Sequence, residues 1–375
     1  MYETEQLTAF LEQLKSTGEN AVMATVVRTS GSTYRKEGAK LVISESGQTV
    51  GSISAGCLEN DVLEIVPQIL ENSEARLLRY DNTAAEDIIW GLGLGCNGIV
   101  EVLVEPVDIT PEFDWTETLR AALDKERAAV VTRFLPTADN TRLHKRKLLI
   151  HADGTTRFSL GDPMVDNWAA NTAIGLLERR SSATVKFEAE GQDSHDVFFD
   201  VISPAPRLVI VGADPDSIPI VAFGRQLGFR VVIVDHRAAF ANPERYPQAD
   251  ETIVCWPEEL PAKLKIDSNT WLLIKTHNYL RDKDILKFAL NSDACYVGQL
   301  GPNARVRDLM SDLAKDNVLF ADEQLTRLYA PVGLDIGADS PEQIAMSILS
   351  EMIAIYNRRQ GGFLRAQDQA IHPRQ

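Results

Sequence analysis

Apolar and polar positions follow two different patterns along the chain, and the later part has the simpler one. From Arg207 onward, short β-rich runs such as RLVIVG and FRVVIVD alternate with stretches whose apolar residues recur at helical spacing. Three more runs of the same kind follow, and they read ETIVCW, WLLIKTH and ACYVGQL. Strands and helices that alternate in this way predict βαβ units, and hence a doubly wound parallel sheet with helices on its faces.

The end of this region predicts a further helix from its capping residues. Ser340 suits the N-cap, Pro341 the first helical position and Gln343 the third, a combination typical of a helix start. The apolar residues that follow recur on one helical face: Ile344, Ile348, Met352 and Ile355.

The earlier part of the chain predicts a mixed α+β domain. Strand-like runs at 21–29 and 39–44 lead into a hairpin, and two more strands are predicted at 75–81 and 98–106. Between them, apolar residues at helical spacing predict an amphipathic helix that begins near Cys57: Leu58, Val62, Ile65, Val66 and Ile69. Residues 111–203 read as further helices and strands, and we assign no chemistry to them.

Two prolines mark the boundary between these regions. The segment Ser203–Pro206 forces extended backbone and fits poorly inside a helix or a sheet. We therefore expect a mixed α+β domain over residues 1–203, which includes the less regular segment 111–203, followed by the parallel-sheet domain over 204–375. The length agrees, since 375 residues at roughly 150 per domain favour two domains. No repeat with a period of 20 to 50 residues is visible.

Composition and charge narrow the classes of partner. The chain has 38 Lys and Arg against 54 Asp and Glu, and the formal charge of −16 opposes binding to nucleic acid or to anionic lipid. No uncharged apolar run approaches the roughly 18 residues that a membrane span requires. Four cysteines are too few for a disulfide framework, and the acidic start reads as an amphipathic helix, so we expect a reducing cytoplasm.

The densest chemical signal is a Gly/Ser turn that carries a cysteine to the start of a predicted helix. The turn and the start of the helix read Gly51-Ser52-Ile53-Ser54-Ala55-Gly56-Cys57-Leu58-Glu59. Free amides at a helix N-terminus stabilise negative charge, so they would favour a thiolate and form a cradle for an anion around Ser54 and Gly56. Cys57 would then suit a metal ligand or a nucleophile. The alternative is a small buried residue where helix meets sheet.

A second cysteine lies in a run with four glycines among eight residues, Gly91–Gly98. Glycine at this density permits left-handed backbone and close approach to a ligand, so Gly95 and Cys96 are further site candidates. The two glycine-flanked cysteines lie 39 positions apart and form no CxxC knuckle, which disfavours a structural zinc site. The remaining two, Cys255 and Cys295, lie in apolar strand patterns and are interpreted as core residues.

Arginines and hydroxyl groups gather at the end of the first predicted strand. Arg28, Ser32 and Arg35 surround one glycine and are candidates to clamp a phosphate or another oxyanion. The alternative is that both arginines are solvated at the strand end.

The parallel-sheet region carries a modified dinucleotide-binding turn. The run RLVIVGADPDS has the expected place, and Asp235 closes the next strand 23 residues after Gly212, about the distance of a ribose-binding acid. The topology is therefore Rossmann-like. Asp214, however, stands where a glycine normally lets a pyrophosphate approach, and Asp216 adds a second negative charge. Unless a cation intervenes, we expect NAD(P) to be repelled.

His277 follows a predicted strand at the edge where parallel sheets bind ligands, so it is a candidate proton carrier or ligand. The alternative is an ordinary loop residue. The basic run 144–147 is interpreted as a solvated strand face and not as a nucleic-acid site.

Several separated blocks together resemble the XdhC/CoxI family, accessory proteins for the maturation of xanthine dehydrogenase and related molybdenum hydroxylases. They lie at roughly 21–106 and 199–353 and read TVVRTSGSTYRKEGAKLVI, VGSISAGCLENDVLEIV, GCNGIVEVLVEP, SPAPRLVIVGA, VVIVDHR, KTHNYLRD, YVGQLG and APVGLDIGADSPEQIAMSILSEM. The resemblance implies a maturation factor and not an enzyme. Such a factor binds the molybdenum cofactor transiently, protects it while a cysteine desulfurase supplies its sulfido ligand, and passes it to the apo-hydroxylase. A homodimer is compatible with this role.

Residue by residue, the family's two Gly-Cys pairs fall on Gly56-Cys57 and Gly95-Cys96, and its Arg/Ser turn on Arg28, Ser32 and Arg35. The chain departs from the family most clearly at Asp214, where the family has glycine. Our hypothesis is that Cys57 and Cys96 flank the anionic pterin–molybdenum ligand, one thiolate contacting the metal or carrying sulfur. The competing interpretations are an NAD(P)-dependent oxidoreductase that uses the second domain, and a cysteine redox protein.

Overall fold

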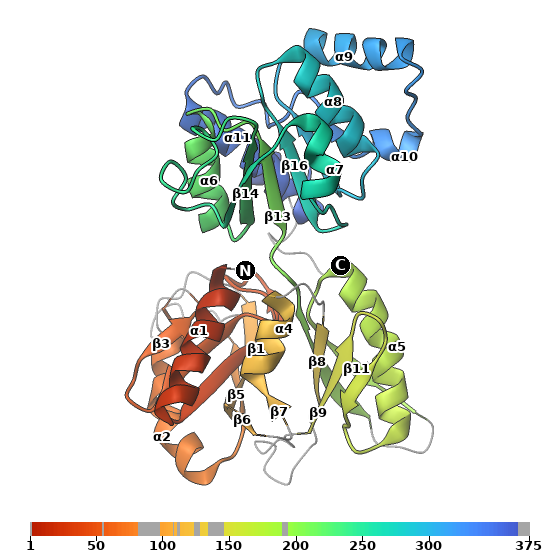
Figure 1. Cartoon of the computed structure of the whole chain (residues 1–375). Helices are drawn as coiled ribbons and strands as arrows, with labels where there is room; N and C mark the ends of the chain where they lie inside the picture. Colours follow the sequence, from red (N-terminus) through yellow and green to blue (C-terminus); the bar gives the residue numbers. More distant parts are fainter. Residues whose placement is uncertain are drawn as a thin grey trace. The chain divides into compact units, whose positions relative to one another are not determined.

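The computed structural model describes residues 2–54, 56–81, 98–107, 109–110, 113–123, 128–133, 146–189 and 194–366. The chain divides into two compact units, an N-terminal unit that contains Glu3–Pro204 and a C-terminal unit that contains Ala205–Phe363 (Figure 1). The division falls within the proline segment Ser203–Pro206. No helix in these described ranges combines the length and the apolar character that a membrane crossing needs.

The C-terminal unit contains a six-stranded sheet in which every neighbouring pair is parallel. Its strands lie in the order β15-β14-β13-β16-β17-β18. Their bounds are β13 (Arg207–Val211), β14 (Arg230–Asp235), β15 (Glu251–Val254), β16 (Thr270–Ile274), β17 (Tyr296–Gln299) and β18 (Leu328–Tyr329). Numbered along the unit this order is 3-2-1-4-5-6, which is the Rossmann order, so the predicted Rossmann-like fold is confirmed. The chain reverses direction across the sheet between β13 and β16.

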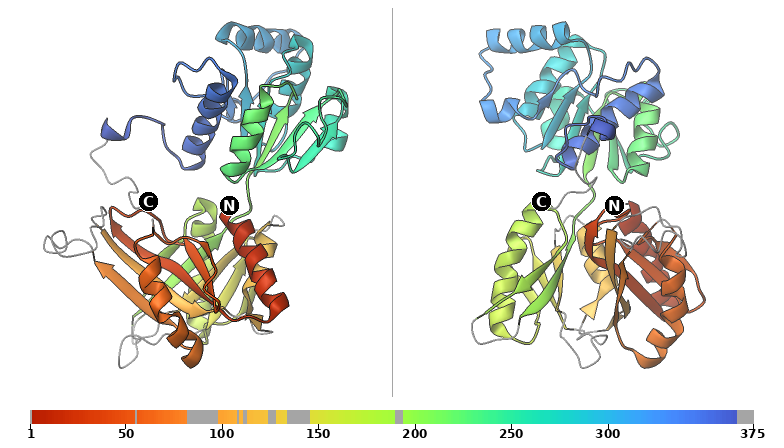
Figure 2. Two further views of the ribbon diagram at one scale, coloured as in Figure 1. Left: turned by 90° about the vertical axis from the view of Figure 1, so that its left-hand side faces the viewer. Right: turned by 180° about the vertical axis from the view of Figure 1, so that it is seen from behind.

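Helices cover both faces of this sheet, as the alternation of apolar residues dictates (Figure 2). Leu208 and Ile210 of β13 point to one core, which α6 (Ser217–Gln226) and α11 (Pro341–Tyr356) close. Val209 and Val211 point to the other core, on the side of α7 (Leu260–Lys263), α8 (Tyr279–Leu290) and α9 (Asn303–Lys315). The short α10 (Asp322–Leu325) precedes β18.

The N-terminal unit contains two five-stranded antiparallel sheets, with orders β3-β2-β1-β5-β4 and β10-β9-β8-β12-β11. The first has β1 (Ala21–Gly31), β2 (Lys40–Ser44), β3 (Thr49–Gly51), β4 (Arg76–Asp81) and β5 (Gly98–Pro106). The second has β8 (Ala128–Arg133), β9 (Lys147–His151), β10 (Thr156–Phe158), β11 (Ala183–Phe187) and β12 (His195–Ile202). A small ladder joins β6 (Ile109–Thr110) to β7 (Phe113–Asp114). The predicted mixed α+β class of this domain is confirmed.

Each sheet of the N-terminal unit packs one face against a helix of its own. α2 (Glu59–Asn72) closes a core on the first sheet, and α5 (Pro163–Arg179) closes a core on the second. The opposite faces of the two sheets share a third core with α1 (Tyr2–Thr17) and α4 (Trp115–Leu123). Alternating strand residues make this double packing possible, because successive side chains point to opposite faces.

Two buried ion pairs connect the sheets of the N-terminal unit. Lys40 Nζ donates to Asp200 Oδ1 at 2.8 Å, and Lys147 Nζ donates to Glu105 Oε2 at 2.7 Å. All four side chains are buried. Both pairs therefore lie inside the molecule, where a charge is tolerated only with a partner.

Candidate functional site

A turn built around one serine hydroxyl holds Cys57 at the start of α2. Ser54 Oγ accepts hydrogen bonds from the backbone amides of Gly56, Cys57 and Leu58 at 3.2, 3.0 and 3.1 Å. The same hydroxyl donates to the carboxylate of Glu59. The amides that we expected to cradle an anion therefore already have an acceptor, and that acceptor belongs to the predicted site residue Ser54.

Glu59 fixes the shape of the turn from the helix side. Its carboxylate accepts from Ser52 Oγ at 3.0 Å and from the amide of Ser54 at 2.9 Å. Burial alone would raise the pKa of Glu59, but the hydrogen bonds from Ser54 outweigh it and hold this pKa below its usual range. Glu59 is thus an anion that the hydroxyl and amide groups of the turn stabilise by hydrogen bonds. The sequence motif included Glu59 but no role was predicted for it, although an acid in the first turn of a helix is a common stabilising feature.

The Cys57 thiol is exposed, which disagrees with the alternative of a small buried residue. Gly56 beside it is also exposed and has φ +102, a backbone conformation that favours glycine, with open space where a side chain would project. The turn therefore presents its thiol to solvent on a backbone that a carboxylate and a hydroxyl hold in place.

The predicted arginine cluster is engaged in ion pairs. Arg35 Nη2 donates to Glu3 Oε2 at 2.6 Å, and the other oxygen of Glu3 accepts from the amide of Ser52 at 3.2 Å. This carboxylate therefore joins the arginine segment to the Cys57 turn. Arg28 lies 2.7 Å from Asp196 Oδ2 and 3.3 Å from Glu101 Oε2.

Arg28 thus ties β1 to a strand of the other sheet, and Ser32 between the two arginines is exposed. Gly95 and Cys96 lie outside the described residues. Gly98, which ends their glycine run, pairs with Gly31 at the end of β1. A side chain at Gly98 would clash with the carbonyl oxygen of Ser30, so glycine is needed there for close approach of the strands.

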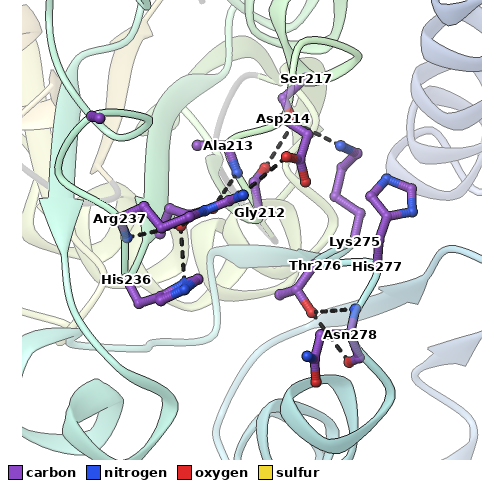
Figure 3. Close-up of polar contacts among 12 residues, drawn as sticks. Gly212, Ala213, Asp214, Ser217, His236, Arg237, Lys275, Thr276, His277 and Asn278 are labelled. Atoms are coloured by element: carbon purple, nitrogen blue, oxygen red, sulfur yellow. Dashed lines mark hydrogen bonds and ion pairs between the residues drawn. The ribbon is translucent and has the colours of Figure 1, made fainter.

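In the C-terminal unit, the carboxyl ends of β13, β14 and β16 gather acids and cations around Gly212 (Figure 3). Gly212 has φ +123, and a Cβ there would clash with the carbonyl oxygen of Lys275. The space beside Gly212 is therefore filled by the protein's own backbone.

Asp235 already has partners for both carboxylate oxygens. Its Oδ2 accepts from the amide of Ala213 at 2.9 Å and from Arg237 Nη2 at 2.8 Å, while its Oδ1 accepts from Arg237 Nε at 2.9 Å. Burial would raise the pKa of Asp235, but the hydrogen bonds from Arg237 and Ala213 outweigh it and hold this pKa at about 2. A ribose hydroxyl would have to compete with these donors.

Both acids that we expected to repel an anion are paired with a cation. Arg237 Nη2 lies 3.1 Å from Asp214 Oδ1. The buried Lys275 donates to Asp216 Oδ1 at 2.7 Å and to Ser217 Oγ at 2.8 Å. We expected these acids to repel NAD(P) unless a cation intervenes. Arg237 and Lys275 are such cations.

His277 also lies beside this turn. Its Nε2 is 3.4 Å from Asp216 Oδ2, and its backbone has φ +56, an uncommon conformation for a residue with a side chain. Lys275 was missed by sequence reasoning. Its signal was a charged residue placed directly after the apolar run WLLI, where parallel strands present their functional side chains.

A small open pocket lies next to Asp235, between the ends of β13 and β14 and the helix α8. His236, Cys255, Thr276 and Arg281 contribute to its lining. Cys255 also belongs to the core behind the pocket, as expected. Within the part of the chain that the structure describes, no cluster of three or more His, Cys, Asp or Glu side chains could hold a metal ion.

Comparison with known proteins places these features in a family. The model of the XdhC and CoxI family matches residues 14–81, and that of the XdhC Rossmann domain matches residues 208–352. A relative from Bacillus subtilis, named as a probable xanthine dehydrogenase subunit, is 29% identical over 348 residues, which are 93% of this chain and 97% of that relative. The molybdenum cofactor insertion chaperone PaoD of Escherichia coli is 22% identical over 350 residues, 92% of this chain and 86% of PaoD.

A crystal structure described as a xanthine dehydrogenase from Bacillus halodurans has the same fold. It aligns with a TM-score of 0.74 and 31% identity, covering 95% of this chain and 98% of that one. The Cys57 turn lies within the first matched family segment, and the Gly212 turn lies within the second. The resemblance seen in the sequence is thereby confirmed, and the chain belongs to the XdhC and CoxI family.

Proposed function

We propose that this protein is a maturation factor that binds the molybdenum cofactor transiently and delivers it to a xanthine dehydrogenase-type hydroxylase. Family membership supports the proposal, as do the relatives named as a cofactor insertion chaperone and as part of a xanthine dehydrogenase. A cysteine desulfurase that supplies the cofactor's sulfido ligand and the apo-hydroxylase are its proposed partners in the cytoplasm. In this role the protein is a carrier and not an enzyme.

The observation that carries the proposal is the exposed thiol of Cys57 on a turn braced by Ser54 and Glu59. A thiolate is a soft donor, and it suits either contact with a metal centre or temporary transfer of sulfur. The chemistry of this donor therefore fits the metal end of the proposed cargo. The nearby Arg35 retains partial exposure beside the turn and is the proposed contact for the anionic end.

Molybdenum content tests the proposal directly. The protein is purified from its own host and its bound molybdenum is measured by elemental analysis, beside Cys57→Ala, Cys96→Ala and the control Cys295→Ala. We expect Cys57→Ala to lower the molybdenum content at least tenfold, and Cys295→Ala, at a residue packed against the core of the C-terminal unit, to leave it unchanged. Unchanged molybdenum in both Cys57→Ala and Cys96→Ala would contradict the proposed site. A wild-type protein without molybdenum would contradict the function.

The second candidate is an NAD(P)-dependent oxidoreductase, which the Rossmann strand order favours. The engaged carboxylate of Asp235 and the backbone contact at Gly212 argue against it. Titration with NADH and NADPH, followed by their fluorescence, decides between the two. We expect no saturable binding, and micromolar binding of either nucleotide would favour the oxidoreductase.

A further inference from the structure

The N-terminal unit repeats one fold twice. The first repeat runs α1, β1, β2, β3, α2, β4, β5, and the second runs α4, β8, β9, β10, α5, β11, β12. The strand orders β3-β2-β1-β5-β4 and β10-β9-β8-β12-β11 are the same order in each repeat. In Figure 1 the two repeats lie side by side, the first from red to orange and the second from yellow to green.

The described residues within 21–81 and 128–188 correspond at an offset of 107 positions. Thr25 pairs with Lys40 in the first sheet, and Thr132 pairs with Lys147 at the same place in the second. Left-handed backbone recurs at the same offset: Gly47 and Gly154, Gly51 and Phe158, Ser73 and Arg180. Both hairpin turns and both helix C-caps are therefore equivalent.

The hydrogen bonds that join the Cys57 turn to the first acid of its helix recur as well. We call this arrangement of turn and carboxylate the hydrogen-bonded ring. In the first repeat the carboxylate of Glu59 accepts from Ser52 Oγ at 3.0 Å and from the amide of Ile53 at 3.2 Å. In the second repeat Asp166 accepts from Ser159 Oγ at 2.6 Å and from the amide of Leu160 at 2.8 Å. Since the second repeat has no cysteine in this turn, the ring itself is scaffold.

The buried ion pairs cross between the repeats in a symmetric way. Met23 pairs with Glu105 in the first sheet, and Val130, its counterpart, pairs with Asp200 in the second. Glu105 and Asp200 are therefore equivalent, as are Lys40 and Lys147. Each lysine binds the acid of the opposite repeat, the reciprocal pattern of a two-fold symmetric interface.

The repeats differ at the residues of the proposed site. Gly56 and Cys57 correspond to Pro163 and Met164, and proline cannot adopt the φ of +102 found at Gly56. In the second repeat the helix starts in the ordinary way, with Asp162 accepting from the amide of Met164.

The connection between the last two strands differs too. Arg76 pairs with Val104, 28 positions later, whereas its counterpart Ala183 pairs with Phe199, 16 positions later. The first repeat therefore has twelve more residues between these equivalent paired positions, a stretch that includes Gly95 and Cys96 in the sequence.

We propose that the N-terminal unit is an internal pseudo-dimer whose two repeats have divided their roles: the first binds the cofactor through Gly56 and Cys57, and the second is its structural partner. This inference rests on the proposed function for the ligand, and on the pairing of the strands for the duplication. It assigns Ser52 and Glu59 a structural role only. Their counterparts Ser159 and Asp166 make the same hydrogen bond in a turn that has no thiol.

Exchanging the turns between the repeats tests the division of roles. One variant of the full chain carries S54G, A55D, G56P and C57M, the sequence of residues 161–164, and the control carries the reverse changes G161S, D162A, P163G and M164C. Both are loaded with molybdopterin-type cofactor, and retained molybdenum is measured. We expect the first variant to lose at least tenfold and the control to equal wild type. The single variant Cys57→Met covers the case in which the first variant does not fold.

Equal loss in both exchanges would show a site shared by the repeats, and full retention in the first exchange and in Cys57→Met would place the site elsewhere. Either result overturns the division of roles. A second comparison tests the duplication without any cofactor. Glu59→Gln and Asp166→Asn break equivalent rings, so both should lower the unfolding temperature by a similar amount. A loss confined to Glu59→Gln would contradict the equivalence, whereas wild-type protein that retains no cofactor contradicts the proposed function alone.

Discussion

Lys40 and Asp200 are 160 positions apart in the sequence, yet Lys40 Nζ donates to Asp200 Oδ1 at 2.8 Å inside the N-terminal unit. Burial raises the pKa of Asp200, and the charge of Lys40 opposes that shift. The carboxylate therefore depends on its lysine. Removing one partner of such a buried pair costs more than the pair contributes, because the other charge is left without compensation.

The first prediction concerns this pair. Lys40→Met should lower the free energy of unfolding by about 3–5 kcal/mol, since Asp200 is left buried and unpaired. Lys147→Met should cost a similar amount through Glu105, and the double variant Lys40→Met with Asp200→Leu should recover much of the loss. Urea unfolding followed by circular dichroism measures all three. A Lys40→Met protein within about 1 kcal/mol of wild type would show that Asp200 is neutral in the folded chain.

The second prediction is a pH dependence at Asp235. Its folded pKa of about 2 lies below the usual value, so the ionised carboxylate stabilises the fold above pH 4 and this contribution is lost as the pH falls from about 4 to about 2. Asp235→Asn should therefore destabilise the protein by about 2 kcal/mol at pH 7. Urea unfolding in a series from pH 7 to pH 3 should show the difference from wild type shrinking only below pH 4. A difference that shrinks near neutral pH would point to another group.

The third prediction compares two glycines of the C-terminal unit. Gly212→Ala should cost about 3 kcal/mol, because its positive φ disfavours a side chain and the new Cβ meets the carbonyl of Lys275. Gly337 also has positive φ but has open space around it, so Gly337→Ala should cost only about 1 kcal/mol. Thermal unfolding of the two variants measures both. Equal losses would mean that the approach of β13 to β16 is not tight.

The fourth prediction concerns the left-handed backbone at His277. Asn tolerates this conformation and should leave the stability close to that of wild type, whereas the β-branched Val should lower it by about 1–2 kcal/mol. The side chain is largely exposed, so little packing is lost in either variant. Denaturant unfolding of His277→Asn and His277→Val tests the difference. If the Val variant matches the Asn variant, the strain at this position is not significant.

Features that depend on local pattern were predicted from the sequence. The apolar runs gave the strands β13 to β17, and Ser340 caps α11 by accepting from the amide of Gln343 as its position indicates. These features are readable because each depends on residues that are neighbours in the chain or that recur with a fixed period.

Features that depend on distant partners were not predicted. Arg28 looked like a free anion clamp, but its partner Asp196 is 168 positions away. The two acids beside Gly212 looked repulsive until strands β14 and β16 brought Arg237 and Lys275 to them. The duplication escaped notice because its offset is 107 positions and few residues are identical, so that it is visible only in strand pairing and backbone geometry.

The crossed ion pairs also set an order of events during synthesis. The ribosome releases the chain from its N-terminus, so Lys40 emerges long before Asp200 has been made. At roughly 5–20 residues per second, the interval is about 8–30 s. Throughout that time the first repeat holds a lysine that it cannot bury without its partner. We therefore expect the face of the first repeat that carries Lys40 to stay exposed to solvent until the second repeat has been synthesised and the two repeats pack against each other.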